Sequence, residues 1–233
     1  MSRKRFVNPF KTLSSVEWGI WFASLTAVAV SFLIMQKNDY LALITALIGA
    51  SAVFFVSKGH IIGQMLTVVF AILYGIVSFI YGYYGEIVTY VGMIAPTAII
   101  AIISWFKNSH KQARKSRKSH IITNKQILIM ILSAVCVSVA FFFILRALNT
   151  PRLLISVASI FTVFIAVYLT FLRSSNSSLV YAANDIVLIV LWVLATRQNS
   201  AYAPMVVCFI IFLANDIYGF IDWKRNERIR RRK

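Results

Sequence analysis

Eight long apolar stretches, separated by short polar links, constrain this chain more than any other feature. A helix needs about 20 apolar residues to cross the hydrocarbon core of a bilayer, and each stretch approaches or reaches that length with almost no charge inside it. We therefore predict an all-α integral membrane protein with eight transmembrane helices. The predicted helices are Val16–Met35, Leu41–Val56, Ile61–Tyr81, Ile87–Phe106, Gln126–Leu145, Leu153–Leu172, Leu179–Ala195 and Ala201–Trp223.

The distribution of basic residues predicts the orientation. A net charge of +17 would suggest nucleic-acid binding in a soluble protein. Here the lysines and arginines lie in links and tails, so we expect a lipid bilayer and no nucleic acid as partner. An eight-helix arrangement with an internal N-terminus places 20 of the 24 basic residues on the cytoplasmic side, as the positive-inside rule requires. We predict a multi-pass protein of the cell membrane with both termini in the cytoplasm.

The chain also shows a weak internal repeat. A shift of 118 residues places Tyr74 on Trp192, Tyr84 on Tyr202 and Trp105 on Trp223. This shift spans four helices and preserves direction, which predicts two parallel three-helix repeats, an arrangement found in transporters with the substrate site between the repeats. Chance agreement among aromatic residues is the alternative. The predicted parts are a basic N-terminus with an extra helix (1–36), a first repeat (37–106), a basic cytoplasmic loop (107–125), a linker helix (126–148), a second repeat (149–223) and a basic cytoplasmic tail (224–233).

Two aspartates lie deep in the predicted bilayer, where an ionisable side chain is costly and indicates function. Asp185 follows Asn184, and Asp216 follows Asn215. Each aspartate precedes a tryptophan by seven residues, about two helical turns, so each aspartate shares a helix face with its tryptophan. We expect Gln64 to join these four residues in one polar layer toward the cytoplasmic side. The other acidic residues, Glu17, Asp39, Glu86, Asp222 and Glu227, are expected at helix ends or in links.

An aromatic layer is expected next to the polar layer. Tyr74 and Trp192 occupy matching depths in the two repeats. Aromatic faces beside amides and carboxylates suit a flat heterocycle attached to a sugar, and carboxylates without basic neighbours favour a cationic ring. The alternatives are amides that only join helices and tryptophans that form an interfacial belt. Pro96 lies within a helix and is a hinge candidate, with a static kink as the alternative.

No enzymatic constellation is found. The histidines His60, His110 and His120 fall in links, and the two cysteines fall in apolar stretches. We therefore expect neither catalytic residues nor a metal site nor a cofactor. A membrane enzyme and a signalling subunit are the alternatives from other classes, and the second would leave the polar layer without a purpose.

At several of these positions the chain resembles the Pnu-type (PnuC-like) vitamin transporter family. The resemblance rests on Gly63-Gln64, Tyr74-Gly75, Tyr83-Tyr84-Gly85, and Asn215-Asp216-Ile217-Tyr218-Gly219 with Trp223 after it. It implies an extra N-terminal helix before a three-plus-one-plus-three arrangement related to the SWEET fold. It also implies a homotrimer and adds Tyr218 to the substrate site.

The resemblance further implies uptake of a ribosylated vitamin precursor, with nicotinamide riboside first, by facilitated diffusion. A cytoplasmic kinase would trap the product by phosphorylation. The nicotinamide riboside members carry a late Trp-x-x-Trp, whereas the only such pair here is Trp18 and Trp21 in the first helix. Thiamine, riboflavin or another (deoxy)nucleoside, and a proton-coupled version through Asp185 or Asp216, are the alternatives.

Overall fold

The computed structural model describes residues 15–35, 39–57, 60–115, 122–172, 174 and 176–231. Several predictions concern residues outside these ranges: the basic N-terminus within 1–36, the middle of the 107–125 loop, the end of the 224–233 tail, and Lys37, Lys58 and Arg173 in the links. The side chains of Asp222 and Trp223 also lie outside the described part of the chain.

The described residues form helices only. Eight spans among them are long and apolar enough to cross a membrane, which confirms the predicted number. The fourth span is composite, because α4, a π-helical segment and α5 follow one another without a break. The elements are α1 (Ser15–Met35), α2 (Tyr40–Ser57), α3 (Ile61–Ile80), α4 (Tyr84–Ile87), the π-helix η2 (Val88–Ile94), α5 (Ala95–Lys115), α6 (Asn124–Ala147), α7 (Leu153–Phe171), α8 (Asn176–Thr196), the 3-10 turn η3 (Ser200–Tyr202) and α9 (Ala203–Arg231).

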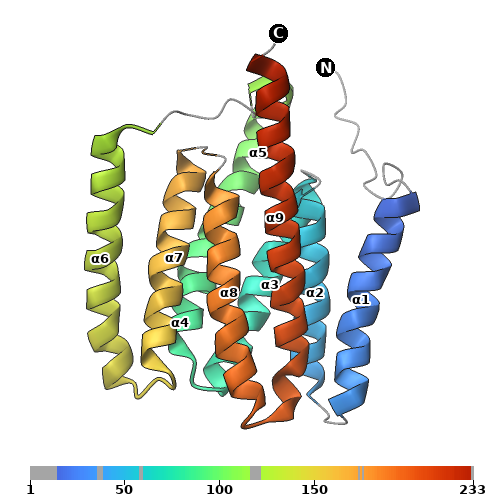
Figure 1. Ribbon diagram of the computed structural model, residues 1–233, viewed down its shortest axis with the longest axis vertical. Helices are drawn as coiled ribbons and strands as arrows, with labels where there is room; N and C mark the ends of the chain where they lie inside the picture. Colours follow the sequence, from blue (N-terminus) through green and yellow to red (C-terminus); the bar gives the residue numbers. More distant parts are fainter. Residues whose placement is uncertain are drawn as a thin grey trace.

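The long helices stand side by side as a single bundle (Figure 1). The first turn of α1 and the last turn of α9 lie at the same end of it, as an even number of crossings requires. We call this the terminal end and the opposite end the far end. Helix α2 packs against α3 and α9, and α8 packs against α7 and α9, whereas α6 lies at the edge beside α7. The region between α2, α3, α8 and α9 is therefore the interior.

Small residues allow the interior helices to approach closely. A methyl group added at Gly63, in the first turn of α3, would lie 2.3 Å from the backbone nitrogen of Val56 at the end of α2. One added at Gly49 would lie 2.7 Å from the Phe70 ring. Close backbone packing of this kind is the main source of helix association in a bilayer, where lipid competes for apolar surface.

The start of the fourth span differs from the prediction. The helix begins at Tyr84 rather than at Ile87, so Glu86 lies inside a helix and is completely buried. Glu86 therefore lies in the first turn of this span, at a helix end as predicted, but the prediction did not include its complete burial. The cause of the early start is Gly82, which with φ of +75° closes a tight turn after α3 and lets the next helix begin at once.

Two further differences concern helix geometry. The sequence analysis did not predict a π-helix. The π-helix η2 ends at Ile94, and only Ala95 separates it from Pro96. Pro96 itself is exposed in the first turn of α5, and its role as a hinge stays a prediction. Helix α8 begins at Asn176, three residues before the predicted start, so Asp185 lies more than two turns into the helix. The division into two parallel repeats also stays a prediction.

Candidate functional site

A cavity of about 350 Å³ opens between α2, α3, the fourth span, α7, α8 and α9. Its volume falls at the lower end of the roughly 300–1,000 Å³ typical of small-molecule sites. The lining comes from the last turns of α2 and the first turns of α3 and α8, so the cavity lies toward the terminal end (Figure 1). The polar residues that line it are Gln64, Thr67, Tyr90, Thr97, Thr170, Ser177, Ser178, Tyr181, Asn184, Asp185 and Asp216.

Both deep aspartates face this cavity, Asp185 from α8 and Asp216 from α9. Asp185 is only 3% exposed, and its Oδ2 has no hydrogen-bond partner among the described residues. None of the described lining residues is a lysine or arginine. A buried carboxylate without a basic partner is costly, and a bound cation would relieve that cost.

The amides divide into two groups. Gln64 and Asn184 line the cavity, and the Asn184 Oδ1 accepts a 2.9 Å hydrogen bond from the Thr162 hydroxyl on α7, which fixes the side chain. Asn215 does not line it, because its Nδ2 donates a 2.8 Å bond to the Ile211 carbonyl one turn earlier in α9. Four of the five residues predicted for the polar layer therefore lie together. Tyr218, which the family resemblance added, is half exposed and lies off the lining.

The predicted aromatic pair is also found, in a different arrangement. Tyr74 and Trp192 are completely buried, and the indole Nε1 of Trp192 donates a 2.8 Å hydrogen bond to the Tyr74 hydroxyl. Neither residue lines the cavity. They belong to an aromatic cluster that fills the bundle beyond the cavity and also contains Tyr83, Tyr202 and Phe209.

Two aromatic residues that the sequence analysis missed form the cavity wall nearest to this cluster. Tyr90 comes from η2 and Phe212 from α9, and the Tyr90 ring centroid lies 4.5 Å from that of Tyr74. Tyr90 is a polar aromatic residue within an apolar run, as Tyr74 is, and that feature could have identified it.

Side-chain contacts close the far end of the bundle. The Arg152 guanidinium, at the start of α7, donates to the Tyr83 hydroxyl (2.6 Å) and to the Leu194 carbonyl (2.5 Å). Tyr81, after α3, donates to the Asp39 carboxylate before α2. These contacts join the far ends of the spans above the aromatic cluster, so this structure offers its polar cavity toward the terminal end.

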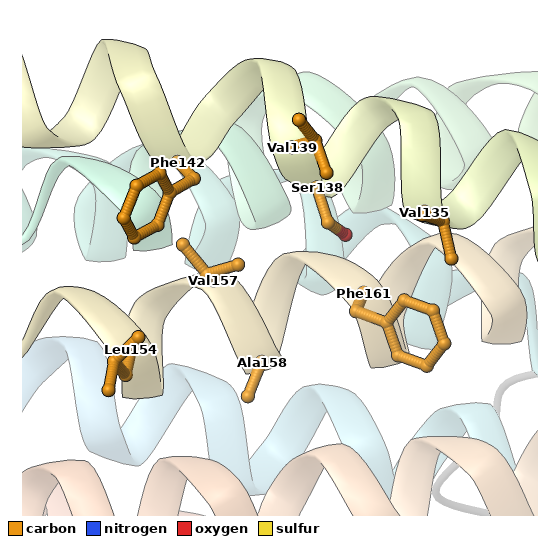
Figure 2. A pocket seen from close by; sticks show the side chains of 8 residues that line it. All are labelled: Val135, Ser138, Val139, Phe142, Leu154, Val157, Ala158 and Phe161. Atoms are coloured by element: carbon orange, nitrogen blue, oxygen red, sulfur yellow. The ribbon is translucent and has the colours of Figure 1, made fainter.

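A second cavity, of about 370 Å³, lies between α6 and α7 (Figure 2). Ser138 is the only polar residue in its lining, and the other seven residues are apolar. Its lining contains no charged or amide side chain to bind a hydroxyl-rich solute. The cavity with Asp185 and Asp216 is therefore the candidate site.

Comparison with known proteins decides the family. The profile of the family described as nicotinamide mononucleotide transporter matches residues 39–225, which is most of the chain. The chain belongs to the nicotinamide mononucleotide transporter family. The resemblance noted from the sequence is thereby confirmed, and the chain is a membrane transporter rather than an enzyme.

Relatives within the nicotinamide mononucleotide transporter family align over nearly the whole chain. The "Nicotinamide riboside transporter PnuC" of Neisseria mucosa is 23% identical over 212 residues, covering 89% of this chain and 80% of the relative. The protein of the same name from Haemophilus influenzae is 24% identical over 225 residues, with 96% and 94% covered. A solved structure, "Crystal structure of the Vitamin B3 transporter PnuC", superimposes with a TM-score of 0.73 at 22% identity over 91% of this chain and 92% of that chain, so the fold is shared.

Proposed function

We propose that this transporter carries nicotinamide riboside into the cell by facilitated diffusion. The observation that carries the proposal is the pair of carboxylates, Asp185 and Asp216, in a cavity whose described lining contains no basic residue. Nicotinamide riboside contains a positively charged pyridinium ring and a ribose. The family match and the two relatives that bear its name support the same substrate.

The cavity offers one type of group to each part of this substrate. One of the two carboxylates, Asp185 or Asp216, balances the single positive charge of the pyridinium ring. Gln64 and Asn184 provide donors and acceptors for the ribose hydroxyls, and Tyr90 provides an aromatic face for the ring. Tyr74 and Trp192 lie between the far end and the cavity, and they contact the incoming substrate once their mutual hydrogen bond opens.

The proposal includes the cellular setting that the family resemblance implies. The terminal end faces the cytoplasm across the cell membrane, so this conformation faces inward. The protein assembles as a homotrimer with a site in every subunit, and a cytoplasmic kinase phosphorylates the product and keeps it in the cell. Native mass spectrometry of the detergent-purified protein tests the trimer.

Calorimetry with purified protein tests the substrate. We expect nicotinamide riboside to bind and neutral deoxynucleosides to bind at least tenfold more weakly, because they leave the carboxylates unbalanced. The matched variants Asp185→Asn and Asp216→Asn preserve side-chain size and delete one charge each. At least one of them should lower the affinity for nicotinamide riboside about tenfold.

The alternative substrates predict different results in the same experiment. Tighter binding of thiamine, which is also a cation, would reassign the substrate and keep the role of the carboxylates. Tighter binding of a neutral nucleoside, with normal binding by both variants, would contradict the electrostatic role. Proton coupling would show in transport instead, because accumulation against a gradient would collapse on addition of an uncoupler.

A further inference from the structure

Arg152 lies at the far end of the bundle, where its guanidinium has two acceptors from different parts of the chain. It donates a 2.6 Å hydrogen bond to the Tyr83 hydroxyl, between α3 and α4, and a 2.5 Å bond to the Leu194 carbonyl, near the end of α8. Tyr83 belongs to the first predicted repeat and Leu194 to the second. One side chain thus joins the two predicted repeats at the end where the bundle is closed.

The Leu194 carbonyl is one of the last carbonyls of α8. In a continuing helix the Gln198 N–H would donate to it, but Gln198 donates to the Ala195 carbonyl instead, at 2.9 Å. The last carbonyls of a helix need acceptors' partners from outside the helix, and a guanidinium there also interacts favourably with the helix dipole. Arg152 therefore caps α8 as well as binding Tyr83.

The backbone of Arg152 has an uncommon conformation. Its φ is 52°, in the left-handed region, which a residue other than glycine occupies rarely and only when its surroundings determine it. Asn149, in the same link between α6 and α7, also has a φ of 52°. Loss of the two Arg152 hydrogen bonds would let this backbone relax, so the link favours a second conformation once the side chain leaves its acceptors.

The Arg152 contacts lie next to the aromatic cluster that fills the bundle beyond the cavity. Tyr83 is only 3% exposed, and its ring centroid lies 5.4 Å from that of Trp192. Trp192 donates to the Tyr74 hydroxyl, and the Tyr74 ring packs on Tyr90 in the cavity wall. A continuous chain of contacts therefore leads from Arg152 at the far end to the cavity.

We propose that Arg152 controls access to the transport pathway from the far end. Bound to Tyr83 and Leu194, it holds the two predicted repeats together and keeps the aromatic cluster closed. Arg152 is only partly buried, so water can replace both acceptors of its guanidinium, and this exchange makes the closure reversible. The inference rests on the proposed transport function, and it identifies a contact that breaks when the pathway opens to the side opposite the cavity.

Side-specific cysteine labelling of the full-length protein tests this role. The two native cysteines are replaced (Cys136→Ala and Cys208→Ala), and Val77→Cys introduces a thiol at a completely buried position of α3 in the core cluster. A charged, membrane-impermeant thiol reagent is applied to intact cells and to inside-out vesicles, and a fluorescent protein fused after Lys233 shows which side is the terminal side. Arg152→Ala should raise the labelling rate from the far side at least fivefold, without a rise from the terminal side.

Two further variants make the test specific. Arg146→Ala removes an exposed arginine from the last turn of α6, at the same end of the bundle, and should leave the labelling rate unchanged. Tyr83→Phe deletes only the hydroxyl that accepts from Arg152. It should raise far-side labelling at least twofold, and it tests the contact even if Arg152→Ala does not fold.

Three results would overturn the proposal. The first is unchanged far-side labelling in both Arg152→Ala and Tyr83→Phe. The second is an equal rise from both sides of the membrane, which would show a general loosening of the bundle. The third is the same rise in Arg146→Ala. The labelling uses no substrate, so its outcome is separate from the calorimetry that tests the proposed function.

Discussion

At the scale of single residues, the depth of a polar side chain was predictable and its direction was not. Gln64, Asn184, Asp185 and Asp216 meet in one cavity because their positions along apolar segments fix how far each lies from the terminal end. Asn215 precedes Asp216 directly but bonds to its own helix. The rotation of α9 about its axis decides that difference, and this rotation depends on packing against α2 and α8, which the sequence of one helix does not contain.

The position of Tyr90 predicts a contribution to substrate binding. Tyr90→Ala should lower the affinity for nicotinamide riboside about 5- to 150-fold, the equivalent of roughly 1–3 kcal/mol for a lost aromatic contact. Calorimetry measures the change. Tyr40→Ala is the matched control, since Tyr40 is exposed at the start of α2 and far along the chain from the lining. Equal affinities for the two variants would show that Tyr90 only packs.

The hydrogen bond between Trp192 and Tyr74 predicts an effect on stability. Tyr74→Phe removes only the hydroxyl and leaves the buried indole N–H without its acceptor, which should cost about 1–2 kcal/mol of unfolding free energy. Tyr40→Phe makes the same change at an exposed position and should cost much less. Unfolding by denaturant in detergent provides the comparison. If both variants unfold alike, the bond contributes nothing to the closed aromatic cluster.

At the scale of elements, hydropathy predicted which segments become helices and missed their internal geometry. The eight spans follow from apolar length alone. The π-helical turn Val88–Ile94 involves a change in backbone hydrogen-bond register, and such a change leaves the apolar pattern intact. The early start at Tyr84 was missed for a related reason: a link of three residues, Tyr81 to Tyr83, is too short to stand out in the pattern.

The close contact between α2 and α3 provides a prediction for these elements. Gly63→Ala would place a methyl group 2.3 Å from the Val56 nitrogen and 2.6 Å from the Phe55 carbonyl carbon, and backbone atoms cannot move aside cheaply. We expect a much lower melting temperature or loss of folded protein. Gly19→Ala is the matched control, because nothing lies within 4 Å of the added methyl group in α1. Size-exclusion chromatography and thermal unfolding of both variants measure the difference, and equal stabilities would contradict the tight packing of α2 on α3.

At the scale of the whole molecule, charge and helix number together predict orientation. Eight spans bring α1 and α9 to the same end of the bundle (Figure 1), and the positive-inside rule assigns that end to the cytoplasm. A fluorescent reporter that folds only in the cytoplasm, fused after Lys233, should therefore be bright, and a phosphatase that is active only outside should be inactive there. The opposite pattern would reverse the proposed direction of the inward-facing cavity.

The uneven origin of the cavity's charges has a consequence for how selectivity can evolve. Both carboxylates come from α8 and α9, whereas α2 and α3 supply only uncharged side chains. Under the proposed function, α8 and α9 supply the charged groups that meet the cationic ring, whereas both halves of the chain bind the hydroxyl groups of the substrate, through Gln64 on α3 and Asn184 on α8. A change from a cationic to a neutral substrate therefore requires substitutions in two neighbouring helices only, α8 and α9. Substrate specificity can thus change during evolution while the rest of the transport pathway stays the same.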